Sequence, residues 1–189
     1  IAEATGADLL CPNMVARVTQ GAGRVPVKRV PYATPAAVDF LKDYDLLVLV
    51  GSKAPVGFFA YPNRPSALTP PAMHVVELAQ PRHDLTASLE ALVTAVGADT
   101  AKEATTSALD LPDLPTGSIT KEKLGDLLAN VIPENGIVVD ESITTGFTFF
   151  STAATAQPHD YMLGTGGSIG YALPTAAGAA VACPDRKVI

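Results

Sequence analysis

The stretch GTGGSIGYALP, residues 164–174, lies near the C-terminal end of the chain and governs how the rest of the sequence is interpreted. Its first seven residues include four glycines, so the backbone can adopt positive φ and approach another molecule closely. The small-residue run that follows predicts a tightly packed helix. We therefore expect another molecule to lie against this loop.

The loop allows three interpretations. The first is a glycine-rich turn that only connects a strand to a helix. The second is the nucleophile elbow of α/β-hydrolases, because residues 166–170 fit G-x-S-x-G. The elbow requires an acid and then a histidine after the serine, yet the last histidine, His159, precedes Ser168. This leaves the connecting turn and a third interpretation, a cofactor-binding loop.

Composition limits the class of protein. The chain has 189 residues, of which 48% are hydrophobic, enough for a substantial core. Its longest small-apolar run, Ala172 to Ala182, is well short of the ~20 residues that span a bilayer. A net charge of −6 without a basic cluster argues against nucleic-acid and anionic-membrane partners. Cys11 and Cys183 lack metal-ligand spacing, which favours free thiols and a cytoplasmic location.

The first 42 residues show alternating helix and strand signals. We expect a helix end at Gly6, a strand over Asp8–Pro12, and a surface loop over Arg17–Arg29. Thr34 before a proline predicts an N-cap that opens a helix through Lys42. The N-terminus carries neither a starting methionine nor a signal peptide, so we expect the sequence to be the middle of a longer chain.

The next segment contains the clearest strand, Asp45–Gly51, whose unbroken apolar run predicts a parallel strand covered on both faces. A second strand over Met73–Glu77 and a helix capped by Asp84 and ending at Gly97 follow. Periodicity disappears over 98–117, which therefore predicts a linker.

After the linker, Thr120 predicts the cap of a helix that carries apolar residues at helical spacing up to Val131. The turn at Pro133–Gly136 leads into a strand over Ile137–Asp140. The sequence thus predicts an α/β fold of two Rossmann-like parallel-sheet units, both incomplete.

A hydroxyl-rich turn, Asp140–Gly146, follows this strand. If a helix begins there, free N–H groups and the positive end of the helix dipole suit a diphosphate. The alternative is a capping turn, in which Ser142 or Thr144 serves its own helix. The turn has no Lys or Arg, and Asp140 and Glu141 would repel phosphate. A diphosphate here therefore requires a bridging divalent cation.

The run GGSIGYALPTAAGAAVACPDRKVI, residues 166–189, resembles the diphosphate-binding domain of thiamine diphosphate enzymes of the acetolactate synthase, benzoylformate decarboxylase and pyruvate decarboxylase family. More weakly, the first half of the chain resembles the second half of that family's central domain. The resemblance implies that residues 1–97 are the C-terminal part of the central domain. Residues 98–117 are then the linker, and residues 118–189 the N-terminal part of the diphosphate domain.

The resemblance also implies cofactor-binding residues. The main chain of Ile143 and the hydroxyl of Thr144 would contact the diphosphate, in the turn that also holds Ser142 and Thr145. In the glycine loop, the Gly167 carbonyl would accept from the aminopyrimidine and Ile169 would lie under the bend between the two rings. Ser168 lies between them and is assigned to the same site. A β-branched side chain suits this support because it is stiff at χ1.

The resemblance implies thiamine diphosphate and Mg²⁺ as cofactors. The family's metal motif, Gly-Asp-Gly followed by Asn, is expected beyond Ile189, and its activating glutamate belongs to an N-terminal domain. No catalytic residue is assigned within this chain. We expect a fragment that is inactive alone, from a parent that forms a homodimer or homotetramer.

Two departures from the family limit the reaction. Residues 57–62 lack the catalytic histidine of benzoylformate decarboxylases, and residues 51–55 lack the run found in flavin-binding acetolactate synthases. The favoured function is a 2-keto acid enzyme, acting by acetolactate synthase-like carboligation or by decarboxylation. The alternative is a non-catalytic relative that keeps the fold as a scaffold.

Overall fold

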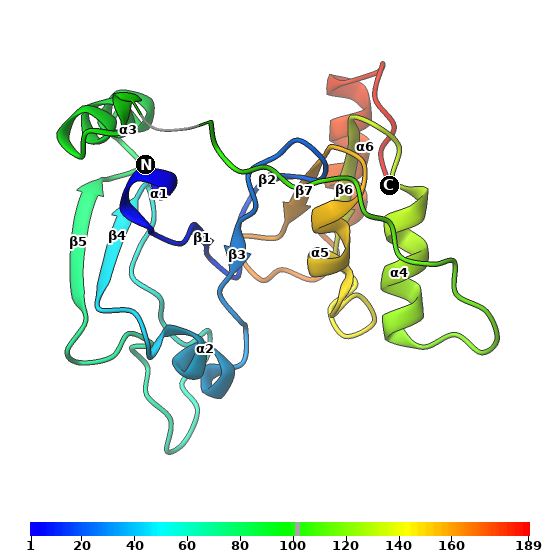
Figure 1. Cartoon of the computed structure of the whole chain (residues 1–189). Helices are drawn as coiled ribbons and strands as arrows, with labels where there is room; N and C mark the ends of the chain where they lie inside the picture. The colour runs from blue at the N-terminus through cyan, green and yellow to red at the C-terminus, as the bar shows by residue number, and fades with distance from the viewer. Residues whose placement is uncertain (101–102) are drawn as a thin grey trace. The chain divides into compact units, whose positions relative to one another are not determined.

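The computed structural model describes residues 1–100 and 103–189, and the chain divides into two compact units (Figure 1). The first comprises Ile1–Asn13 and Lys28–Glu103, and the second comprises Met14–Val27 and Ala104–Ile189. Residues 101–102 of the predicted linker lie outside the described residues. The assignment of 1–97 and 118–189 to the two family domains stays a prediction.

The first unit contains two separate pairs of parallel strands. One pair joins β1 (Leu10–Cys11) to β3 (Lys28–Arg29), and the other joins β4 (Leu46–Val50) to β5 (His74–Ala79). Its helices are α1 (Ala2–Thr5), α2 (Thr34–Leu41), α3 (Leu85–Ala95) and the 3₁₀ turn η1 (Ala98–Thr100). A core cluster is formed by Val30, Ala37, Leu41, Leu68 and Met73.

Capping residues read from the sequence largely position the helices as expected. The Asp84 carboxylate accepts from Ala87 N–H at 3.0 Å at the start of α3, which confirms that cap. Thr34 is different, because the N-cap of α2 is Ala33 and Thr34 is already helical and buried.

The prediction that β4 is covered on both faces is also wrong. Leu46 and Val48, which lie on the same face of the strand, remain 51% and 41% exposed.

The second unit is built on a three-stranded mixed sheet. β7 (His159–Leu163) lies in the centre, parallel to β6 (Gly136–Asp140) and antiparallel to β2 (Val18–Gln20). β2 and β3 both fall within the predicted surface loop 17–29, so that prediction is wrong for Val18–Gln20 and Lys28–Arg29. The backbone of residues 187–189 pairs with the free edge of β6, through bonds that include Ile137 N–H to Lys187 O at 2.8 Å.

Four helical segments complete the second unit: α4 (Lys121–Val131), α5 (Phe149–Thr152), the 3₁₀ turn η2 (Ala153–Thr155) and α6 (Ala172–Ala182). The Thr120 hydroxyl accepts from Lys123 N–H at 3.3 Å and confirms the predicted cap of α4. Tyr161 is fully buried on β7, with its ring 5.2 Å from that of Phe150. The helix after the glycine loop is confirmed as α6, but none of its residues is buried, so the expected tight packing is not found.

Helices combined with parallel strands confirm the predicted α/β class. None of the helices in the described part of the chain combines the length and the apolar character needed to cross a membrane.

Candidate functional site

The two predicted binding segments leave the same edge of the sheet in the second unit. β6 and β7 are parallel and hydrogen-bonded in register, with Asp140 opposite Leu163 at their carboxyl ends. The hydroxyl-rich turn follows Asp140, and the glycine loop follows Leu163. Ligands of α/β proteins commonly bind at this edge, because loops that leave neighbouring strand ends enclose a crevice there.

Glu141 joins the two segments directly. Its carboxylate accepts hydrogen bonds from the N–H groups of Gly170 and Ala172, the second at 2.9 Å. Ala172 is the first residue of α6, so the carboxylate satisfies N–H groups that the start of a helix leaves without an intrahelical partner. The predicted repulsion between Glu141 and a diphosphate stays a prediction, and the structure adds that the glycine loop engages this side chain.

Tyr171 makes the second connection. Its hydroxyl donates to the main-chain oxygen of Asp140 and lies 3.4 Å from that of Met162. A Cβ on Gly164 would lie 2.8 Å from the Tyr171 ring, so the glycine is needed for the ring to pack there. Burial, reinforced by the negative charge of Asp140 and Glu141, raises the pKa of the Tyr171 phenol. The phenol is therefore protonated and able to donate at neutral pH.

The Asp140 carboxylate organises the hydroxyl-rich turn. It accepts from the Tyr161 hydroxyl at 2.5 Å, from Ser142 N–H at 2.7 Å, and from the Ser142 hydroxyl. A hydrogen bond that a backbone N–H donates to the side chain of the aspartate two residues earlier is a common way to fix a turn. Ser142 in turn requires Gly146, because a Cβ there would lie 1.6 Å from the Ser142 hydroxyl oxygen.

Ile143 has a strained backbone. Its φ is 50°, in the left-handed region that a β-branched residue rarely adopts, and its side chain is 66% exposed. Such strain costs about 1 to 3 kcal/mol, and it persists where the surrounding structure fixes the conformation. Thr144 is exposed, and its hydroxyl forms no hydrogen bond with the described residues.

The capping alternative for this turn finds little support. α5 begins only at Phe149, has four residues, and its N-cap, Thr148, makes no side-chain capping bond. The Ser142 hydroxyl is used by Asp140 instead. The expected helix N-terminus directly at the turn is therefore absent, and with it the dipole that was predicted to favour a diphosphate.

The predicted residues of the glycine loop are all exposed. Gly167 has a φ of 65°, which glycine adopts without strain, and Ser168 follows it. Ile169 is 87% exposed, which is unusual for a large aliphatic side chain beside a buried sheet. The structure thus brings Gly167, Ser168 and Ile169 to the same sheet edge as Ile143 and Thr144.

The residues present fit the two ends of a thiamine diphosphate molecule in chemical type. The Thr144 hydroxyl, which has no partner among the described residues, and the strained main chain of Ile143 could serve the diphosphate. The main chain of the exposed Gly167 and the exposed Ile169 side chain could serve the rings. For residues 1–100 and 103–189, no group of three or more His, Cys, Asp or Glu side chains is placed to hold a metal ion.

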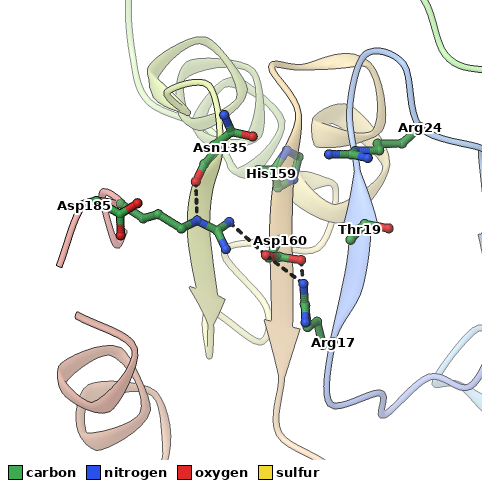
Figure 2. Close-up of a pocket in the computed structure, with 8 residues that line it drawn as sticks. Arg17, Thr19, Arg24, Asn135, His159, Asp160 and Asp185 are labelled. Carbon is green, nitrogen blue, oxygen red and sulfur yellow. Dashed lines mark hydrogen bonds and ion pairs between the residues drawn. The ribbon is translucent and has the colours of Figure 1, made fainter. Parts of the chain in front are cut away.

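A second feature of the same sheet was not found from the sequence. A pocket of about 320 Å³ lies at its opposite edge, beside His159 at the start of β7 and Asn135 just before β6 (Figure 2). Arginines 17, 24 and 186 surround it. These residues are far apart in the sequence and belong to no motif, so no local signal could have grouped them.

The chain resembles enzymes of the predicted family. Over all 189 residues it is 42% identical to a Mycobacterium tuberculosis protein named "Putative acetolactate synthase large subunit IlvX", and it spans 36% of that protein's length. Over 73 residues, which are 39% of the chain, it is 33% identical to benzoylformate decarboxylase from Pseudomonas aeruginosa. This match covers 14% of the length of that protein. No family model matches the chain. The predicted resemblance to acetolactate synthases and benzoylformate decarboxylases is thereby confirmed.

Proposed function

We propose that the chain forms part of a thiamine diphosphate- and Mg²⁺-dependent enzyme that acts on a small 2-keto acid, by acetolactate synthase-like carboligation or by decarboxylation. The likeness of the whole chain to a protein named as an acetolactate synthase large subunit supports this reaction class. The proposal extends to assembly as a homodimer or homotetramer and to a cytoplasmic location.

One observation carries the proposal: Glu141 holds the glycine loop beside the strained turn at Ile143. The carboxylate uses two N–H groups at the start of α6, so a diphosphate would have to be held elsewhere. The main chain of Ile143 and the free hydroxyl of Thr144 are the groups that the turn still offers. Asp140 and Glu141 place negative charge nearby, so Mg²⁺ is needed to offset the repulsion between them and the diphosphate.

In the glycine loop, two residues would contact the rings of the cofactor. The Gly167 carbonyl would accept a hydrogen bond from the aminopyrimidine, and the stiff side chain of Ile169 would contact and support the rings. When bound, thiamine diphosphate would supply the electron sink for 2-keto acid chemistry, while the protein would supply shape and orientation.

The test uses the protein that contains this chain, titrated with thiamine diphosphate at saturating Mg²⁺ and followed by calorimetry. Ile169→Ala is expected to weaken binding and lower turnover, with little change in the melting temperature of the cofactor-free protein. An ordinary core isoleucine would instead cost about 2 to 5 kcal/mol of stability. Ile119→Ala is the matched control, because Ile119 is 83% exposed and lies outside both segments.

Thr144→Val provides an independent arm at the diphosphate end. Loss of one hydrogen bond to a charged group should weaken cofactor binding by roughly 1.5 to 3 kcal/mol, with the fold intact. Thr94→Val, on the exposed surface of α3, should have no effect. If the unaltered protein binds the cofactor and Thr144→Val leaves the affinity unchanged, the hydroxyl has no such role. Absence of cofactor binding to the unaltered protein would favour the non-catalytic scaffold.

A further inference from the structure

The pocket lies at the N-terminal ends of β6 and β7, which we call the amino edge of the sheet. It is positively charged, although the chain as a whole is acidic. Asp160 is paired with Arg17 at 2.7 Å and with Arg186 at 2.8 Å. The third arginine, Arg24, forms no ion pair with any described residue. The remaining carboxylate in the lining is Asp185, so three positive and two negative side chains give the pocket a net charge of +1.

Arg24 is held in place by its backbone. Ala22 N–H donates to Ala156 O at 2.8 Å, Gly23 N–H donates to Ser107 O at 2.8 Å, and Arg24 O accepts from Ser107 N–H at 2.9 Å. The guanidinium itself projects toward the imidazole of His159 (Figure 2). A fixed backbone that presents a guanidinium without a partner is an arrangement suited to an external anion, because less conformational freedom is lost on binding.

His159 supplies the second, independent observation. Its side chain lines the pocket, the residue is only 3% exposed, and Nε2 has no hydrogen-bond partner among the residues that the structure describes. Nδ1 lies 2.7 Å from the carbonyl oxygen of Gln157. Because a carbonyl can only accept, Nδ1 carries the proton, and Nε2 of the neutral ring is an acceptor. Burial lowers the pKa of His159, so the ring is neutral at pH 7.5.

The buried acceptor Nε2 of His159 and the guanidinium of Arg24 together favour a ligand with two chemical properties. It must be an anion, to pair with Arg24, and it must carry a hydroxyl, to donate to Nε2 of His159. Thr19 adds a hydroxyl that can donate to the same anion. Asp185 opposes an anion, but it lies beside β6, whereas Arg24 lies on the β2 side of the pocket (Figure 2).

We propose that this pocket binds a small oxyanion that bears a hydroxyl group, of the kind represented by hydrogen phosphate or a small 2-hydroxy acid. Its anionic oxygens accept from Arg24 and Thr19, and its hydroxyl donates to Nε2 of His159. Arg17 and Arg186 neutralise Asp160 and so remove the charge that would otherwise repel the ligand. The site is separate from the loops at the carboxyl edge and does not depend on the function proposed for them.

Two matched pairs of probes test the hydroxyl requirement. Inorganic phosphate is compared with sulfate, which has no proton at pH 7.5, and lactate is compared with propionate, which lacks the hydroxyl. Calorimetric titration of the full chain should show that phosphate or lactate binds at least tenfold more tightly than its hydroxyl-free counterpart. The pair that shows this preference identifies the source of the oxyanion. Equal binding within both pairs, or no binding of phosphate and lactate, would overturn the proposal.

Variants test the residues. Arg24→Gln should weaken binding of the preferred probe at least tenfold, and Arg82→Gln, an equal change of charge on an exposed site in the first unit, should not. His159→Phe keeps an aromatic ring and should abolish the preference for the hydroxyl-bearing probe. If that variant does not fold, Arg24→Gln still decides, because Arg24 is exposed and its side chain has no hydrogen bond or ion pair within residues 1–100 and 103–189. Undiminished binding by Arg24→Gln would contradict the assignment.

Discussion

The two edges of one sheet use charge in opposite ways. At the carboxyl edge of β6 and β7, the carboxylates of Asp140 and Glu141 accept hydrogen bonds from N–H and O–H groups of the chain itself. At the amino edge, one buried carboxylate, Asp160, is shared by two arginines, while Arg24 forms no ion pair with the residues that the structure describes. The first arrangement exposes main-chain groups and the side chains of Ile143 and Ile169. The second leaves a positive charge available.

If both proposals hold, this one short sheet supports two different kinds of site. The carboxyl edge is organised by neutral donors around carboxylates, so any diphosphate there depends on a metal ion and on main-chain groups. The amino edge already carries the positive charge of Arg24, so an anion there needs no metal ion. Substitutions that remove the organising carboxylate should therefore have unequal consequences at the two edges.

The largest effect is expected from Asp160→Asn, which leaves Arg17 and Arg186 without their shared partner. Removing one member of a buried ion pair costs about 3 kcal/mol or more, although Arg17 is 62% exposed, which reduces its share. Urea unfolding monitored by circular dichroism measures the loss. A cost below about 1 kcal/mol would show that the carboxylate does not organise the amino edge.

The same substitution should alter the dependence of stability on pH. Burial raises the pKa of Asp160, but hydrogen bonds and charges from Arg17 and Arg186 outweigh it and hold the pKa below its ordinary value. A lowered carboxyl pKa contributes stability above the unfolded-state value of about 3.9, and this stability is lost as the pH falls through the folded-state pKa. The difference between the unaltered protein and Asp160→Asn should thus be constant from pH 8 to pH 5 and shrink below about pH 4.

A smaller effect is expected from Glu141→Ala at the carboxyl edge. The change removes the acceptor for Gly170 and Ala172 N–H, and hydrogen bonds to a charged group are worth about 2 kcal/mol. Amide hydrogen exchange of these two residues should become faster, while exchange at Ile137 in β6 stays slow. Glu134→Ala, an exposed acidic residue in the preceding turn, is the control and should change neither. Unchanged exchange at Gly170 would mean that Glu141 does not hold the loop.

The smallest effect is a gain in stability from Ile143→Gly. Glycine removes the strain of a positive φ, and the exposed isoleucine side chain gives little burial to lose, so we expect a gain of about 1 kcal/mol. Asn135→Gly is matched, because Asn135 also has a positive φ, of 58°, yet asparagine tolerates it. That control should shift the melting temperature little. A loss of stability for Ile143→Gly would show that the side chain contributes contacts in solution.

The carboxyl edge could be predicted from the sequence because its signals are local. The glycine loop, the hydroxyl-rich turn and the strand before it each lie within about ten consecutive residues, and β6 and α6 are found where expected. Their roles toward a cofactor stay predictions. What local patterns could not show is that Glu141 reaches across to Gly170, 29 positions away in the chain.

The amino edge could not be predicted, for a physical reason. β2 is three residues long, is flanked by polar residues and glycine, and pairs with a strand about 140 residues later. Such a strand is stabilised by its partner and not by its own periodicity, so Val18–Gln20 resembles a loop in sequence. The same distance hides the pairing of Arg17 with Asp160, which depends on that strand.

Gly21, at the end of β2, limits which substitutions the amino edge can accept. Its φ is 97°, and a Cβ at this position would lie 2.4 Å from the Gln157 carbonyl oxygen and 2.8 Å from that of Ala156. These obstacles are main-chain atoms, which cannot turn aside as a flexible side chain can. In a saturation mutagenesis library, Gly21 should therefore tolerate as few substitutions as a catalytic residue. A residue with no side chain and no ligand would be among the most constrained positions of the chain.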